Sequence, residues 1–492
     1  MKDLKQKTIQ GGLARLLAQG ANFALRVGSL MILARLLGPE DYGLVGMVAA
    51  FTGVLSLFRD FGLSSAAIQR AEVTEEQIST LFWINLLVGV LLTLLTVAMA
   101  PAIAAFYHQP RLVPVTAVMA LGFLFNALGI QHSVLLQRQM RFTTMAVIST
   151  VSLTVGTVVG IAGAKAGYGY WALVAMTIAS PFVATIGYWM AAAWIPGRPR
   201  RRAGIRSMMH FGGTLTLNSL LAYLAYNAEK IMIGRYWGAD AIGIYGRAYQ
   251  LINIPTDNLN TAVGEVAFSA LSRIQNDFAR LKSYFLKGYS LVLGLTIPTT
   301  IACALFPEDI IRILLGSKWG EAAPIFRLLA PTILIFAIIN PLGWLLFSLG
   351  LVKRSLKIAC VFSPLIIAGY ALGLPYGPKG VAFAYSAVMT LWVLPHIAWC
   401  VRGTGISLGD ILLAVSRPLA SGILAGGLAY IVRMAIGQSL SPLPRLLLES
   451  TVLFTVFLAL LLFVAGQKSL YLDILRGVRG PAAVKEKDLV SA

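Results

Sequence analysis

The sequence predicts an all-α polytopic membrane protein, and three observations carry that prediction. Hydrophobic residues make up 58% of the 492 residues, while charged residues make up 12%, about half the ~25% usual in soluble domains. The mean hydropathy is +0.78. The apolar runs are continuous, whereas the strands of an outer-membrane barrel alternate apolar and polar residues. In a bilayer each backbone group must then pair inside its own helix.

Windows of about 20 apolar residues predict about fourteen transmembrane helices. The first, with Lys2, Lys5 and Lys7 before it, is longer than the apolar core of a signal peptide and is expected to be retained. The spans are expected near 11–37, 42–64, 78–105, 111–136, 142–164, 170–194, 208–235, 240–268, 284–306, 323–348, 354–374, 379–401, 417–436 and 444–465.

The basic residues orient these spans. With the N-terminus in the cytoplasm, the cytoplasmic segments hold 26 of the 40 Lys and Arg residues and the opposite loops hold 10. The positive-inside rule therefore predicts that both termini are cytoplasmic. This distribution also explains most of the net charge of +20, so nucleic acid is not expected as a partner.

A shift of 200 residues aligns the first span with the seventh without a gap. The identities include Gly38 with Gly238, Gly43 with Gly243 and Gly46 with Gly246. Each half then holds six spans, which predicts two parallel lobes around a central cavity. The expected segments are an N-terminal lobe (1–200), a C-terminal lobe (201–405), two additional helices (406–466) and a cytoplasmic tail (467–492).

Polar residues recur at helical spacing in spans one, two, seven and eight. A charge in the hydrocarbon core costs at least ~2.5 kcal/mol, so such residues need a cavity or a partner. The candidates for binding a diphosphate and sugars are Arg26, Arg59, Arg247, Asn22, Gln19, Tyr223, Asn227 and Lys230, and those for ion or proton coupling are Asp257, Asp60 and Glu229.

Structural alternatives apply to several of these residues. Neutral polar stripes also hold helices together. Four charged candidates lie near expected span ends, where a charged side chain can reach the headgroup region at little cost in free energy: Arg59, Asp60, Glu229 and Lys230. Arg26 is near the middle of its span, so its guanidinium is too far from either membrane surface for this alternative. The cysteines and histidines form no metal-binding pattern, so no metal or other cofactor is expected.

The segments LARLLGPEDYGLVGMV (33–48) and FRDFGLSSAAIQR (58–70) resemble polysaccharide transporters of the multidrug/oligosaccharidyl-lipid/polysaccharide flippase superfamily, in particular Wzx-type flippases of lipopolysaccharide and exopolysaccharide biosynthesis. The resemblance implies a flippase that moves undecaprenyl-diphosphate-linked oligosaccharides from the cytoplasmic to the periplasmic leaflet by alternating access. It also implies a polysaccharide polymerase and chain-length machinery as partners. In the related lipid II flippases essential arginines lie in helices one, two and eight, which here contain Arg26, Arg59 and Arg247.

Two other functions stay open from the sequence. A cation-coupled multidrug exporter of the same superfamily needs an acid-rich site, which Arg26 opposes. A membrane polysaccharide polymerase or ligase usually carries a large catalytic outer loop, and the longest loop here is 307–322. The sequence therefore favours a transporter over an enzyme.

Overall fold

The computed structural model describes residues 20–59, 73–199, 206–436, 439–468 and 471. Within 206–273, the side chains of 206–219, 221–222, 224–225, 257–263 and 265–266 fall outside the description. The described part is helical and contains no strand, which confirms the predicted fold class.

A helix over 20–36 precedes the labelled elements. They are α2 (Pro39–Ser56), α4 (Glu75–Tyr107), α5 (Leu112–Arg138), α6 (Phe142–Lys165), α7 (Tyr170–Ala192), α8 (Arg206–Arg273), α9 (Phe278–Leu305), α10 (Pro307–Leu314), η1 (Ser317–Trp319), α11 (Ala322–Leu329), α12 (Pro331–Ser348), α13 (Val352–Gly373), η2 (Leu374–Tyr376), α14 (Gly377–Val401), α15 (Leu408–Ala435), α16 (Pro442–Ala459) and a π-helical turn, η4 (Leu460–Val464). Each of the fourteen expected spans is occupied by helix in the described residues.

Spans seven and eight form one long helix, α8, with a break at Gly238. Gly238 has φ 81° and ψ −172°, a conformation that glycine adopts without a steric cost. Its counterpart in the repeat, Gly38, is the N-cap of α2, where Pro39 occupies the first turn and Asp41 Oδ2 accepts a hydrogen bond from the Gly38 amide. Both repeats therefore break their first helix at the same position.

The described helices fall into two compact units. Unit 1 comprises Met1–Arg247, Leu314–Ala322 and Ser363–Ala384, and unit 2 comprises Ala248–Ile313, Ala323–Phe362 and Tyr385–Ala492. This division assigns the first part of α8 to the unit of the N-terminal helices, whereas the sequence places the lobe boundary at residue 200. The assignment of the two lobes and the C-terminal segments stays a prediction.

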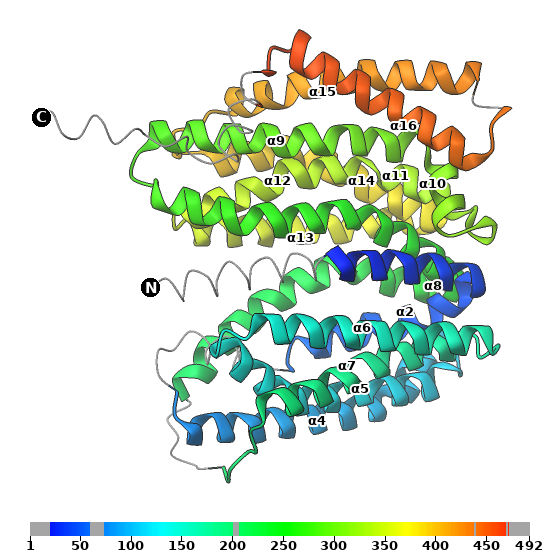
Figure 1. Cartoon of the computed structure of the whole chain (residues 1–492), viewed down its shortest axis with the longest axis vertical. Coiled ribbons are helices and arrows are strands. Elements are labelled where there is room, and N and C mark those ends of the chain that lie inside the picture. The colour runs from blue at the N-terminus through cyan, green and yellow to red at the C-terminus, as the bar shows by residue number, and fades with distance from the viewer. Residues whose placement is uncertain (1–19, 60–72, 200–205, 437–438, 469–470, 472–492) are drawn as a thin grey trace, which may run out of the picture. The chain divides into compact units, whose positions relative to one another are not determined.

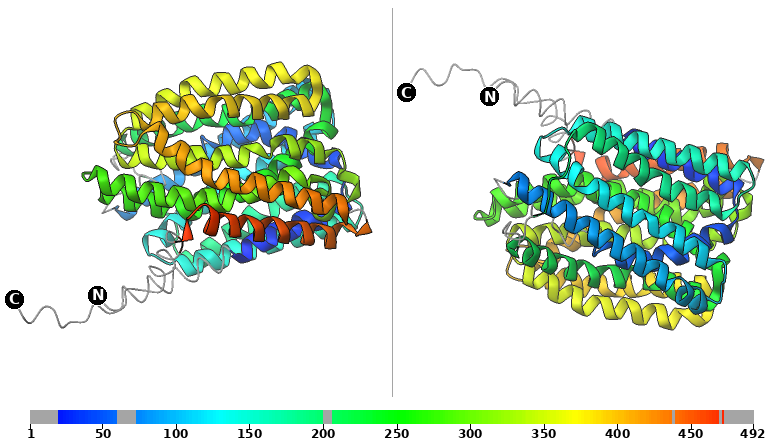
Figure 2. Two further views of the ribbon diagram at one scale, coloured as in Figure 1. Left: turned by 90° about the horizontal axis from the view of Figure 1, so that it is seen from above. Right: turned by 90° about the horizontal axis from the view of Figure 1, so that it is seen from below.

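In unit 1, α5 packs against both α4 and α7, and α6 packs against α7 (Figure 1). Figure 2 shows these four helices running side by side along most of their lengths. Small residues permit the close approaches, since a Cβ at Gly89 of α4 would meet Ala127 of α5. In unit 2, α9 packs against α12 and α15, and α15 packs against α16.

The outward faces of these helices are apolar. On α4, Leu87, Leu91 and Leu94 are 59%, 56% and 60% exposed and lie on one helical stripe. Such a continuous apolar surface requires lipid around it. Among the described residues, nine helical segments are long and apolar enough to cross a membrane. These nine do not include the helices of spans one, two, seven and eight, which carry the predicted polar stripes.

Candidate functional site

The contact between α2 and α8 in unit 1 is built on two glycines. A Cβ at Gly43 would overlap the carbonyl oxygen of Ala239, and a Cβ at Gly243 would overlap the carbonyl oxygen of Pro39. Residues 39 and 239, like residues 43 and 243, are 200 positions apart, so the two contacts are reciprocal. This reciprocity is expected of two repeats related by a two-fold axis. The glycines of the repeat therefore bring the two polar helices together.

Tyr223 of α8 lies against the other end of α2. Its hydroxyl donates long hydrogen bonds to the carbonyl oxygens of Ala50 (3.4 Å) and Ala49 (3.5 Å). A Cβ at Gly53 would overlap this hydroxyl. Tyr223 is therefore part of the α2–α8 packing as well as a polar group of the predicted stripe.

Asn227 and Lys230 form a polar pair one turn further along α8. The Asn227 amide donates to the Tyr223 carbonyl at 3.0 Å, and its Oδ1 accepts a hydrogen bond from Lys230 Nζ at 2.7 Å. Both side chains are half-buried. The structure thus joins Tyr223, Asn227 and Lys230 into one continuous polar stripe, as their spacing predicts.

Glu229 lies beside this stripe and is fully buried. Within the part of the chain that the structure describes, neither of its carboxylate oxygens has a hydrogen-bond partner. A buried carboxylate without a partner is costly when ionised, so its presence calls for a role in addition to packing. Glu229 therefore has no exposed surface on the protein, while its depth in the membrane stays a prediction.

Arg247 contacts an aromatic cluster. Its Cζ lies 4.2 Å from the centroid of the Tyr42 ring, and Tyr42 meets Trp319 edge to face at 5.4 Å. The Trp319 indole in turn donates to the Ala34 carbonyl at 2.8 Å. A guanidinium over an aromatic ring is stabilised by about 0.5–2 kcal/mol, so Arg247 is held in place by Tyr42.

The remaining basic candidates occupy different parts of unit 1. Arg26 is exposed on the helix over 20–36, and Asn22 on the same helix is half-buried with its Oδ1 lacking a hydrogen-bond partner. Arg59 follows the C-terminal end of α2, and its buried Nε also lacks a partner. Asn22 Oδ1 and Arg59 Nε therefore retain hydrogen-bonding capacity that the described residues do not use.

The length of α2 separates two of the predicted arginines. Arg247 contacts Tyr42 in the first turn of α2, whereas Arg59 lies seventeen positions further along the chain. At 1.5 Å per residue this corresponds to about 25 Å, several times the size of a diphosphate. Arg59 and Arg247 therefore lie toward opposite ends of α2.

Three predicted site residues cannot be placed. Gln19 and Asp60 lie outside the described residues, and the side chain of Asp257 on α8 is also outside them.

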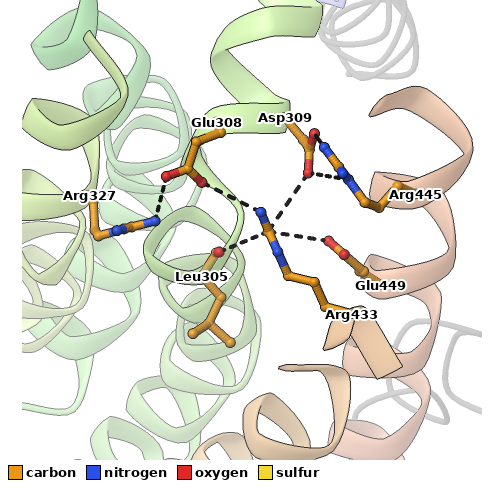
Figure 3. Close-up of polar contacts among 7 residues, drawn as sticks. All are labelled: Leu305, Glu308, Asp309, Arg327, Arg433, Arg445 and Glu449. Atoms are coloured by element: carbon orange, nitrogen blue, oxygen red, sulfur yellow. Dashed lines mark hydrogen bonds and ion pairs between the residues drawn. The ribbon is translucent and has the colours of Figure 1, made fainter. Parts of the chain in front are cut away.

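An ionic cluster in unit 2 was missed by the sequence analysis (Figure 3). Asp309 of α10, 1% exposed, accepts two hydrogen bonds from the Arg445 guanidinium, and Arg433 lies 3.7 Å from it. Arg433 also reaches Glu449 at 3.7 Å and donates to the Leu305 carbonyl at 3.1 Å.

Glu308 extends this cluster on its more exposed side. It accepts a hydrogen bond from Arg327 of α11 at 2.6 Å and lies 3.7 Å from Arg433. The cluster thus connects α15 and α16 with α10, α11 and the end of α9 (Figure 3). A signal was present in the sequence. The Glu308–Asp309 pair lies in the expected loop 307–322, and Arg433 and Arg445 lie at the ends of two expected spans that face each other across a loop on the same side of the membrane.

The sequence is similar to that of known proteins of polysaccharide biosynthesis. The family model described as polysaccharide biosynthesis protein matches residues 32–324, more than half of the chain. The lipopolysaccharide biosynthesis protein WzxC of Escherichia coli (strain K12) is 26% identical over 399 residues, which cover 79% of this chain and 80% of WzxC. The teichuronic acid biosynthesis protein TuaB of Bacillus subtilis (strain 168) is 32% identical over 298 residues, covering 59% of this chain and 61% of TuaB.

Solved structures agree on the fold. The lipid II flippase MurJ in an inward closed conformation aligns with a TM-score of 0.73 and 15% identity, over 91% of this chain and 98% of that one. An inward-facing multidrug transporter of the MATE family aligns with a TM-score of 0.63 and 15% identity, over 80% and 98%. From the family match, the chain belongs to the polysaccharide biosynthesis protein family.

Proposed function

We propose that this protein is a flippase that moves a polyprenyl-diphosphate-linked oligosaccharide across the bacterial inner membrane for the assembly of a surface polysaccharide. Membership of the family supports this function, as does the name of another relative, the succinoglycan biosynthesis transport protein ExoT of Rhizobium meliloti (strain 1021), 25% identical over 314 residues. We further propose undecaprenyl as the lipid, the cytoplasmic leaflet as the origin and the periplasmic leaflet as the destination.

The observation that carries the proposal is Arg26, an exposed guanidinium near the middle of the predicted first span, on the same helix as the polar Asn22. A guanidinium keeps its charge at any relevant pH and pairs bidentately with phosphate oxygens. A cationic substrate would be repelled by it. The substrate that fits carries its negative charge in the headgroup and its apolar chain in the lipid, as a polyprenyl diphosphate does.

The separation of the arginines along α2 favours a sequence of contacts over one clamp. Arg59 lies toward the end of α2 that the charge distribution assigns to the cytoplasm, and Arg247 lies toward the opposite end. In this mechanism the diphosphate meets Arg59 on entry, Arg26 near the middle of the membrane and Arg247 before release. The hydrogen-bonding groups of Asn22, Tyr223, Asn227 and Lys230 would face the sugars.

The buried acid of the same region is the proposed coupling group. Glu229 is fully buried without a hydrogen-bond partner, so gain or loss of a proton there changes a charge inside unit 1. Asp257 and Asp60 remain additional candidates for coupling. Movement of residues 1–200 against 201–405 would provide alternating access, with the two C-terminal helices added to the second lobe.

The direct test measures flipping of a defined polyprenyl-diphosphate oligosaccharide by the purified protein in proteoliposomes. We expect Arg26→Ala to lower the flipping rate at least about a hundredfold, because a charge-assisted bidentate contact is lost. Arg26→Lys should retain part of the activity, since the charge remains without the fork geometry. The matched control is Arg280→Ala, an exposed arginine of α9 in unit 2, which should flip at the parent rate.

The same vesicles separate the other functions. Efflux of a cationic dye without lipid flipping would identify a multidrug exporter, and elongation of the oligosaccharide would identify a polymerase. Flipping at the parent rate by Arg26→Ala would remove the anion-binding role of this residue. In cells lacking the gene, surface polysaccharide restored by the parent but not by Arg26→Ala or Asp257→Asn would support both residues.

A further inference from the structure

A pocket lined by basic side chains lies in unit 2, at the turn between α12 and α13. The turn and the neighbouring end of α14 form an open pocket of about 530 Å³. Its lining comprises Gly350 to Arg354, Lys357 and Trp399. None of the residues singled out for the flippase function belongs to it.

The turn that shapes the pocket is a Schellman motif. Gly350, with φ 71°, donates from its amide to the Phe347 carbonyl at 3.1 Å, and the Leu351 amide donates to the Leu346 carbonyl at 2.8 Å. These two bonds close α12 and direct the chain into α13. The pocket therefore has a defined backbone wall.

Three cations surround this wall. Lys353 and Lys357 are four residues apart and lie on one face of the first turns of α13, and both are exposed. Arg354 is half-buried, and its Nη1 donates to the carbonyl oxygens of Cys400 (3.3 Å) and Arg402 (2.5 Å). Both bonds use Nη1, so they orient the guanidinium without using the other N–H groups of the fork.

The lining contains no carboxylate to neutralise these charges. The pocket also lies at the N-terminal end of α13, where the helix dipole favours an anion. Three positive groups with different geometries, gathered around one concavity and uncompensated, are suited to a ligand that carries several negative oxygens.

The pocket is placed at the level of a membrane surface. The apolar segment Val352–Val401 begins at its edge. Val352 and Leu356 are 54% and 44% exposed and form an apolar stripe next to the two lysines. Trp399 lies where α14 ends, and tryptophan is enriched at such interfaces. A ligand here would have its phosphate against the cations and its apolar part beside α13.

We propose that this pocket binds the phosphate group of an anionic membrane lipid, on the side that the charge distribution assigns to the cytoplasm. The inference does not depend on the flippase function. The pocket lies in unit 2, and none of its residues is a proposed transport residue. An ordinary phospholipid headgroup has the required chemistry.

Trp399 provides the reporter for the test. The full chain, purified in detergent, is titrated with phosphatidylglycerol or with phosphatidylcholine, each with dibrominated acyl chains that quench tryptophan fluorescence. The quenching that is lost in Trp399→Phe belongs to this pocket. We expect saturable quenching of Trp399 by phosphatidylglycerol, with at least about tenfold weaker binding of phosphatidylcholine.

The charge variants examine the recognition itself. Each lysine at a membrane surface contributes about fivefold to the binding of an anionic lipid, so Lys353→Gln with Lys357→Gln should weaken phosphatidylglycerol binding about thirtyfold. The matched control is Arg280→Gln with Lys287→Gln, which removes the same charge from exposed positions of α9 in the same unit and should change binding less than twofold.

Inorganic pyrophosphate distinguishes the sources of the phosphate. Relief of the phosphatidylglycerol quenching by pyrophosphate would support recognition of the phosphate group. Pyrophosphate binding without any quenching by phosphatidylglycerol would overturn the assignment to a lipid and leave a site for free phosphate. Equal binding of the two phospholipids, or an equal loss in the control pair, would overturn the proposal.

Discussion

Glu229 in unit 1 and Asp309 in unit 2 are both buried acids, with 0% and 1% exposure, yet their surroundings differ. Asp309 accepts two hydrogen bonds from Arg445 and lies near Arg433, in a cluster that connects α10 with α15 and α16. Neither carboxylate oxygen of Glu229 has a hydrogen-bond partner among the residues that the structure describes. Asp309, which connects three helices, therefore has its hydrogen bonds made. Glu229, which lies among the predicted transport residues, does not.

The glycine contact that holds the helix of Glu229 against α2 should be the most sensitive position. Gly43→Ala places a methyl group on the Ala239 carbonyl, and we expect a loss of about 4 kcal/mol or more in the free energy of unfolding, or no folded protein. Thermal unfolding of the purified variant in detergent measures this effect.

The repeat supplies the control for that experiment. Gly246→Ala introduces a methyl group with nothing within 4 Å, so its melting temperature should equal or exceed that of the parent. Gly243→Ala should behave like Gly43→Ala because the two contacts are reciprocal. A tolerated Gly243→Ala would contradict the two-fold arrangement of this contact.

Neutralising Asp309 should give the next largest change in the free energy of unfolding. Asp309→Asn removes the buried charge that pairs with Arg445 and lies near Arg433, and we expect about 2–4 kcal/mol of destabilisation. Glu308→Gln, in the same cluster but with a side chain 51% exposed, should cost no more than about 1 kcal/mol. Equal melting temperatures for the two variants would show that burial of Asp309 does not matter.

Neutralising Glu229 should change the free energy of unfolding in the opposite direction. Glu229→Gln removes a buried charge whose oxygens have no hydrogen-bond partner among the described residues, so we expect an increase in stability of about 1 kcal/mol, together with a loss of flipping in proteoliposomes. Greater stability with unchanged flipping would separate Glu229 from transport. Lower stability would mean that the carboxylate has a structural role after all.

The smallest change in the free energy of unfolding is expected at Tyr223, where α8 meets α2. Tyr223→Phe removes hydrogen bonds of 3.4 and 3.5 Å to the carbonyl oxygens of α2, which we expect to change the unfolding free energy by less than about 1 kcal/mol. Gly53→Ala is the informative counterpart, because its methyl group would overlap the tyrosine hydroxyl. Combining it with Tyr223→Ala should restore part of the stability that Gly53→Ala loses.

The sequence by itself determined the helical class, the fourteen spans and the polar stripes. These features depend on local periodicity and on apolar length, which the bilayer makes strict because backbone groups must pair within each helix. The pairing of Asn227 with Lys230 is of this kind, since residues three apart on a helix lie side by side. The break at Gly238 also follows from its alignment with Gly38.

The tertiary structure decided which of these polar groups are satisfied. Arg445 and Asp309 are 136 residues apart, and Trp319 is 285 residues from the carbonyl that it contacts. The location of Arg247 on Tyr42, and its separation from Arg59, likewise depends on how α2 meets α8. Helical periodicity states which face a residue occupies but not what lies opposite, because that partner is chosen by packing between distant segments.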